Sequence, residues 1–351
     1  MAAPVPRLSW PVISELRTEQ QAVEPGGLER RALGQSGIEV SVIGFGAWGI
    51  GGLTAGASSY GETDDAVSRR ALLAAYERGI NFFDTAPAYG AGHSERLIGE
   101  TLALVRGDIV IATKGGMPDF DSAVDFSPVE LQRALEGSLR RLRSDYVDVY
   151  QLHNPTDSLF EHPGPVVALV EALRRDGVIR IFGVSVARPE DGLIAMERFE
   201  LDTIQVNFNL VDQRVIDCGL MERAALRGVT LIARTPLCFG LLSGAVARDA
   251  RFDSTDHRSR WSQAQIAQWA DAADRFASSM EGEAVQTKAQ IALRYCLSYP
   301  IVATTIPGML TENEVKENTA VGALGPLSSR ELETVRAIYQ EEVFFVGGRS
   351  G

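Results

Sequence analysis

The chain contains 351 residues with a formal net charge of −12, and 45% of its residues are hydrophobic. Length suggests about two domains, although an α/β barrel of more than about 250 residues can form a single one. The acidic balance and the lack of a basic run argue against nucleic acid and anionic membranes as partners. The three cysteines, Cys218, Cys238 and Cys296, are widely spaced, so the sequence indicates neither a disulfide framework nor a metal site.

Residues 1–27 contain four prolines and lack the charged and apolar regions of a signal peptide. We expect them to form a loose tail. No apolar run approaches the ~18 residues that a membrane span requires. The expected location is therefore cytoplasmic, with no membrane partner.

From residue 28 onward, short β-branched runs alternate with amphipathic helical patterns. A hairpin is predicted first, with strands over residues 30–33 and 37–40 and a turn at 34–37. Eight further strands are predicted at residues 42–45, 81–84, 109–114, 147–152, 179–185, 203–207, 230–234 and 302–306.

Helix-start signals lie between these runs. Asp64 is placed to cap a helix that ends at Gly79. Ser127 begins a capping-box pattern with proline at the first helical position, and Thr311 and Ser328 begin two more.

Strands that alternate with helices form parallel sheets, and eight such units predict a closed (β/α)8 TIM barrel with an N-terminal hairpin. An open doubly wound sheet is the alternative. Residues 28–351 are then one domain. The longest connections, residues 46–62, 115–126, 153–163 and 237–264, each follow a strand, so we expect them at the end of the barrel where active sites form.

Residues 44–49 match the G-x-G-x-x-G pattern of dinucleotide-binding folds, but the context argues against that interpretation. No predicted helix opens after the pattern, and Asp84, which closes the next strand, lies 40 residues beyond Gly44 rather than the ~20 of the fingerprint. We interpret this segment as a glycine-rich loop that permits close backbone approach, with Trp48 as a wall of a pocket.

Four polar residues gather at the ends of three successive predicted strands. Asp84 and Lys114 close their strands, His153 follows the next one, and Tyr89 lies five residues after Asp84. Because the carboxyl ends of parallel barrel strands lie on one face, these side chains should converge. An ion pair with Asp84 would also offset the free-energy cost of burying the Lys114 charge.

This set of side chains suits proton transfer to a carbonyl oxygen. A neighbouring lysine cation favours phenolate, so we expect it to lower the pKa of Tyr89 from ~10 and make the phenol a usable proton donor. His153 can orient a carbonyl oxygen. No side chain supplies a hydride, so carbonyl reduction would require a cofactor.

At this point the sequence resembles the aldo-keto reductase family. The resemblance rests on residues 79–90, on Ser94 with Glu95 and Gly99, on 111–114, and on 145–148 leading to His153, and it extends over residues 28–345. It implies a TIM barrel that binds a nicotinamide cofactor without a Rossmann domain. It also implies that Asp84, Tyr89, Lys114 and His153 are the catalytic tetrad, with Tyr89 as general acid.

The resemblance carries cofactor residues over one by one. At the nicotinamide end they are Ser185 and Gln205, which match carboxamide ligands, and Arg234, which stands where many members stack a tyrosine. The usual asparagine after the serine is Val186 here. The remaining positions are Gly46, Leu237, Gly240 and Leu242 along the cofactor, and Gly308, Glu314, Glu317 and Asn318 at the adenosine end.

Glu314 bears on the choice of nicotinamide. Members that prefer NADPH place lysine or arginine around residues 308–314 to hold the 2′-phosphate, and residues 306–315 contain no basic residue here. A carboxylate would repel the phosphate and could accept a hydrogen bond from a ribose hydroxyl, so NAD(H) is slightly favoured over NADP(H). Alternatively, Glu314 simply completes the capping box with Thr311.

The predicted function is reversible, NAD(P)-dependent hydride transfer between the nicotinamide and a small aldehyde, ketone or alcohol, with Trp48 and Tyr60 in the substrate pocket. Two alternatives stay open. One is a sugar or polyol dehydrogenase that works mainly in the oxidative direction. The other is a non-catalytic, redox-sensing accessory subunit, a role that the resemblance allows. The sequence does not indicate the substrate or the oligomeric state.

Overall fold

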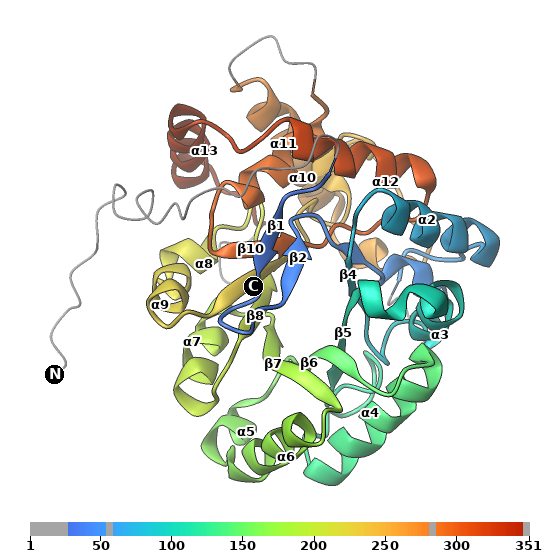
Figure 1. Ribbon diagram of the computed structural model, residues 1–351. Coiled ribbons are helices and arrows are strands. Elements are labelled where there is room, and N and C mark those ends of the chain that lie inside the picture. Colours follow the sequence, from blue (N-terminus) through green and yellow to red (C-terminus); the bar gives the residue numbers. More distant parts are fainter. Residues whose placement is uncertain (1–26, 54–58, 281–285, 347–351) are drawn as a thin grey trace, which may run out of the picture.

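Eight parallel strands form the centre of the molecule (Figure 1). Seven lie within a residue of their predicted bounds, and the first begins only at Phe45, the last residue of its predicted run. The computed structural model describes residues 27–53, 59–280 and 286–346, so all but the last residue of the expected tail lies outside it. The strands are β3 (Phe45–Gly46), β4 (Phe82–Asp84), β5 (Val110–Gly115), β6 (Val147–His153), β7 (Ile179–Val186), β8 (Thr203–Asn207), β9 (Thr230–Arg234) and β10 (Val302–Thr305).

The sheet closes on itself. Neighbours pair in sequence order from β3 to β10, and parallel bridges then join Ile43 to Thr305 and Gly46 to Gly308. The Gly44 N–H donates to the Thr305 carbonyl oxygen across this seam (2.9 Å). The architecture is therefore the predicted (β/α)8 barrel, and the open-sheet alternative is wrong.

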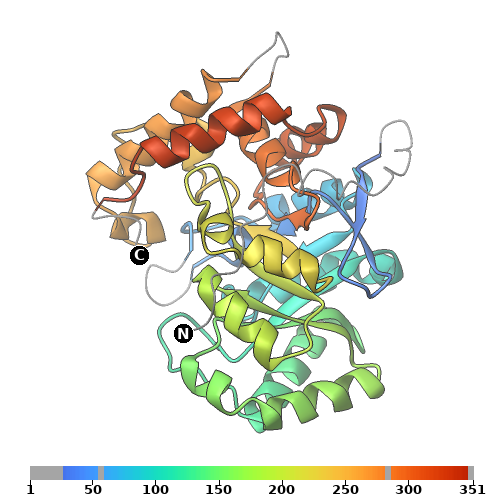
Figure 2. The same cartoon turned by 90° about the vertical axis from the view of Figure 1, so that its left-hand side faces the viewer.

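The predicted hairpin closes one end of the barrel. Strands β1 (Arg30–Ala32) and β2 (Glu39–Ser41) pair antiparallel, and the apolar residues of the hairpin, Leu33, Ile38 and Val40, pack in one cluster with residues that begin the barrel strands, among them Phe82 and Val110. Figure 2 shows the hairpin in blue at the opposite end from the long loops that follow the strands. The amino ends of the strands are thereby sealed, and a site can form only at their carboxyl ends.

Helices surround the strands. They are α2 (Asp65–Glu77), α3 (His93–Leu102), α4 (Pro128–Leu142), α5 (Asp157–Glu161), α6 (Gly164–Arg175), α7 (Pro189–Arg198), α8 (Arg214–Asp217), α9 (Leu220–Leu226), α10 (Gln263–Ala277), α11 (Lys288–Leu297), α12 (Glu312–Thr319) and α13 (Ser329–Glu341). None of the helices in the described ranges is both long enough and apolar enough to cross a membrane.

The helix caps follow the sequence signals with one difference. Asp64 caps α2, and both halves of the capping box form at Thr311 and at Ser328. At α4 only half of the predicted box forms, because the Glu130 carboxylate instead accepts two hydrogen bonds from Arg133.

The glycine-rich segment after β3 does not open an α-helix, as expected. It continues into a single 3-10 turn, Gly49–Gly51. A Cβ atom on Gly46 would lie 2.6 Å from the carbonyl oxygen of Ile306, so this position requires glycine where the two ends of the barrel seam meet. The glycines serve close backbone approach, which confirms that reading of the pattern.

Candidate active site

Lys114 lies at the centre of a fully buried polar cluster. Its Nζ donates to Asp84 Oδ2 (2.7 Å), to the carbonyl oxygen of Thr85 (2.9 Å) and to the hydroxyl oxygen of Tyr89 (2.9 Å). Asp84 and Lys114 come from the carboxyl ends of neighbouring strands, β4 and β5. Three acceptors around one ammonium group satisfy its three donors, so the lysine charge is compensated although the side chain is 0% exposed.

Electrostatics keep the lysine charged and the phenol protonated. Burial alone would lower the pKa of Lys114, but Asp84 and then Tyr89 raise that pKa above its ordinary value. For Tyr89, burial raises the pKa more than the neighbouring Lys114 lowers it, and the Asp84 charge raises it further. The expectation that Lys114 lowers the pKa of Tyr89 below its ordinary value is therefore wrong. Desolvation of the phenolate outweighs its attraction to the lysine charge.

His153 ends β6 and is buried against the same cluster. Burial lowers its pKa well below the ordinary value, and the charges of Lys114 and Arg234 lower it further, so the imidazole is neutral at pH 7. Its ring lies edge-on to Tyr89, with 6.1 Å between ring centroids. His153 Nδ1 is buried and has no hydrogen-bond partner among the described residues.

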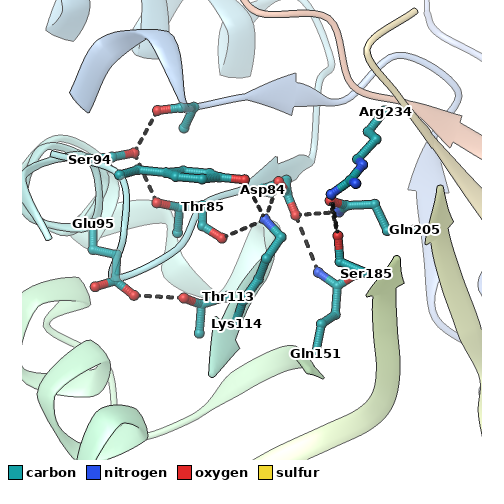
Figure 3. A network of polar contacts seen from close by, with 12 residues as sticks. Asp84, Thr85, Ser94, Glu95, Thr113, Lys114, Gln151, Ser185, Gln205 and Arg234 are labelled. Atoms are coloured by element: carbon teal, nitrogen blue, oxygen red, sulfur yellow. Dashed lines mark hydrogen bonds and ion pairs between the residues drawn. The ribbon is translucent and has the colours of Figure 1, made fainter. Parts of the chain in front are cut away.

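A chain of hydrogen bonds connects Asp84 on β4 to polar side chains of β6, β7, β8 and β9 (Figure 3). Asp84 Oδ1 accepts from Gln205 Nε2 (2.7 Å) and from Gln151 Nε2 (3.3 Å). Gln205 Oε1 in turn accepts from the Ser185 hydroxyl (3.0 Å), which also receives a bond from Arg234 Nη1 (3.0 Å). Asp84, Tyr89 and Lys114 thus form one hydrogen-bonded network with the predicted nicotinamide-end residues, and His153 lies beside it in ring contact with Tyr89.

A cavity of about 760 Å³ opens onto this cluster. At its inner end lie Asp84, Tyr89, His153, Gln205 and Arg234, and at its outer end lie residues of the segment before and within α12. Its lining includes most of the predicted site residues: Gly46, Trp48, Tyr60, Asp84, Tyr89, His153, Gln205, Arg234, Leu237, Gly240, Gly308, Glu314, Glu317 and Asn318.

Three predicted residues lie behind the lining. Lys114 and Ser185 are fully buried and contact lining residues through the hydrogen bonds above. Leu242 is different, because its side chain packs in the hydrophobic core and its N–H donates to the Leu237 carbonyl oxygen (3.0 Å). The structure therefore gives Leu242 no direct place in the cavity.

Aromatic rings form the wall beside Tyr89. Trp48 packs on Tyr60 with 5.1 Å between centroids, and on Phe120 and Phe239 at 6.3 and 6.2 Å. The sequence analysis did not identify Phe120 and Phe239, although both lie in long loops predicted at this end of the barrel. It also missed Gln151, which the alternation of inward residues along β6 places two positions before His153.

The Glu314 carboxylate folds back onto its own helix terminus. Its Oε2 accepts from the N–H groups of Leu310 (2.7 Å) and Thr311 (2.8 Å) and from the Thr311 hydroxyl (3.0 Å). Glu314 thus completes the predicted capping box with Thr311 and also lines the cavity.

The cavity suits an elongated cofactor. It runs from the Tyr89 phenol to the N-terminus of α12, amide and hydroxyl groups gather at its inner end, and Gly308 leaves open space where a side chain would stand. Its volume lies within the range of small-molecule sites, about 300–1,000 Å³. The residues present therefore fit a dinucleotide.

The fold and the site define a (β/α)8-barrel protein with a buried lysine–carboxylate–tyrosine cluster at the carboxyl ends of its strands. The model of the Aldo/keto reductase family matches residues 42–340, and the chain belongs to this family of oxidoreductases, whose members generally use NAD(P)H.

Relatives named for an enzymatic activity align with most of the chain. L-galactose dehydrogenase from Arabidopsis thaliana is 27% identical over 330 residues, which is 89% of this chain and 95% of the relative. NADH-specific methylglyoxal reductase from Escherichia coli is 27% identical over 84% of this chain and 93% of its own. The solved structure of a glycerol dehydrogenase from Gluconobacter oxydans superposes with a TM-score of 0.75 at 30% identity, covering 92% and 98% of the two chains.

Proposed function

We propose that the protein transfers hydride reversibly between a nicotinamide cofactor and the carbonyl carbon of a small aldehyde or ketone, with Tyr89 as general acid and base. One observation carries the proposal: Lys114 Nζ bridges Asp84 and the Tyr89 hydroxyl beside a cavity that also holds neutral His153.

Each member of the cluster has a distinct role. The Tyr89 oxygen accepts from Lys114, which leaves the O–H proton available for a substrate oxygen. As negative charge develops on that oxygen, the proton passes from Tyr89, and Lys114 stabilises the phenolate that remains. Neutral His153 donates a hydrogen bond to the same oxygen and orients it. Asp84 keeps Lys114 charged and in place.

A bound nicotinamide supplies the hydride. Gln205 and Ser185 would hold its carboxamide, and the guanidinium of Arg234 is fixed at the cavity by bonds to Ser185, Asn207 and the Val186 carbonyl oxygen. Residues of the outer end, Leu237, Gly240, Gly308, Glu317 and Asn318, would line the rest of the cofactor.

Oxidation of a sugar or polyol is the second candidate, because the cluster works in both directions. The similarity to L-galactose dehydrogenase and to glycerol dehydrogenase favours it. Kinetics of the purified protein with aldehydes, ketosugars and polyols, each with both cofactors, tests the proposal. We expect turnover with at least one carbonyl or polyol class. Cofactor binding without any turnover would contradict the proposal and favour an accessory subunit.

We further propose a preference for NAD(H). The N–H groups of Leu310 and Thr311 at the start of α12 form an anion-binding position. The carboxylate of Glu314 already takes that position, so a 2′-phosphate would have to displace a bonded negative charge.

Replacing Glu314 by glutamine is expected to raise kcat/KM for NADPH about tenfold and leave kcat/KM for NADH within about twofold, because one charge repulsion of about 1.4 kcal/mol corresponds to a factor of ten. The capping box should survive, because glutamine also completes such a box, as Gln290 does with Thr287 at the start of α11. Glu331→Gln is the matched control, since Glu331 accepts from the Ser328 N–H (2.7 Å) in the equivalent box of α13 and does not line the cavity. If the wild-type protein prefers NADPH and Glu314→Gln keeps the same preference, the proposed role of Glu314 in favouring NAD(H) is wrong.

A further inference from the structure

Gln151 is a buried polar residue that the proposed mechanism does not use. It stands on β6 as the register partner of Lys114 on β5, and its side chain is completely buried. In Figure 3 its amide group points at Asp84, and its Nε2 donates to Asp84 Oδ1 (3.3 Å). Gln151 therefore contacts the carboxylate that holds the lysine.

The other half of the same amide is unsatisfied. Gln151 Oε1 is buried without a hydrogen-bond partner in the described part of the chain. An unpaired buried carbonyl costs free energy, and the inward position two residues earlier on β6 is the apolar Val149. Stability alone would therefore favour an apolar side chain at position 151, so the amide requires another explanation.

Gln151 differs from Gln205 in what it faces. Both amides donate to Asp84 Oδ1, but Gln205 lines the cavity and can exchange its bond for one to a ligand, whereas Gln151 does not line the cavity. The bond from Gln151 is thus the one that stays on Asp84 whatever occupies the site.

We propose that Gln151 is a positioning residue, which holds the Asp84 carboxylate in the orientation that keeps Lys114 against Tyr89 while a ligand engages Gln205. This inference rests on the proposed function. Gln151 acts through Asp84 and does not contact the reacting atoms.

Gln151→Met tests the inference, because methionine has a similar length and removes both polar groups. We expect kcat to fall about ten- to hundredfold through misplacement of the cluster, with an unchanged Kd for the cofactor measured by fluorescence. The Tm should stay at or above the wild-type value, since the unpaired carbonyl is gone. For alcohol oxidation, kcat should rise with pH at a higher pH in Gln151→Met than in the wild-type protein. The reason is that a misplaced Lys114 stabilises the Tyr89 phenolate less.

Gln213→Met is the matched control. Gln213 is also completely buried, but both ends of its amide are bonded, to the Leu210 carbonyl oxygen (3.1 Å) and from Arg336 Nη1 (3.0 Å). We expect a lower Tm with unchanged kcat and pH profile. An unchanged kcat and pH profile in Gln151→Met, or a loss that merely follows a lowered Tm, would overturn the inference. Absence of turnover in the wild-type protein would instead count against the proposed function.

Discussion

Tyr89→Phe is expected to lower kcat by about 10²- to 10⁴-fold in either direction, the usual contribution of a positioned acid or base. The substitution removes one oxygen atom and keeps the ring that stacks on Phe120, with 6.4 Å between centroids. Lys114 keeps its bonds to Asp84 and the Thr85 carbonyl oxygen, so the cluster retains its charge balance. Steady-state kinetics and a cofactor titration of the same preparation separate lost chemistry from lost binding, and we expect the cofactor Kd to stay unchanged.

Tyr150→Phe is the control for this prediction. Tyr150 is also buried but does not line the cavity, and its hydroxyl donates to the Leu131 carbonyl oxygen (3.0 Å) on the outer side of the barrel. Losing that bond should cost about 1 kcal/mol of stability and leave kcat unchanged. Turnover of Tyr89→Phe near the wild-type rate would refute the role of Tyr89.

The positions of the site residues were predictable because strand ends can be read from sequence. Asp84, Lys114 and His153 each follow an apolar run, and parallel closure places the ends of such runs on one face. The capping box of α12 was predictable for a similar reason, since its signal lies within four consecutive residues.

The direction of the Tyr89 pKa shift was not predictable from the sequence. It depends on whether burial of the phenol raises the pKa more than the Lys114 charge lowers it. Burial is a property of the loops that cover the cavity, and their conformation is not encoded in any short motif. The same limit explains Leu242, whose loop turns its side chain into the core. It also explains Glu314, because the sequence pattern predicts the capping box but does not show that one carboxylate oxygen also accepts from the Leu310 N–H and the Thr311 hydroxyl.

Gln151 represents a different kind of omission. Gln151 lies in β6, whose mostly apolar sequence predicts a buried strand. A single amide within such a strand belongs to no recognisable motif. The alternation of Val149, Gln151 and His153 could have flagged it, because a polar side chain at an inward position must be explained by a partner. Inward polar residues of barrel strands are therefore worth examining even when no family motif includes them.

Lys114→Met is expected to affect both stability and catalysis. Removing the ammonium leaves the Asp84 carboxylate buried with only two amide donors, and breaking a buried pair in this way costs about 3–5 kcal/mol. The Tyr89 phenolate also loses the charge that lowers its pKa. We therefore expect a larger fall in kcat for alcohol oxidation, which needs the phenolate, than for carbonyl reduction at neutral pH. Urea unfolding and kinetics in both directions measure the two effects.

The double variant Asp84→Asn/Lys114→Met separates these effects. The introduced amide carbonyl can still accept from Gln205 and Gln151, and no unpaired charge remains, so most of the lost stability should return. Activity should not return, because neither a cation near Tyr89 nor its carboxylate partner is present. If Lys114→Met is as stable as the wild-type protein, the pair does not hold a buried charge. If the double variant is active, proton transfer does not depend on the Asp84–Lys114 pair.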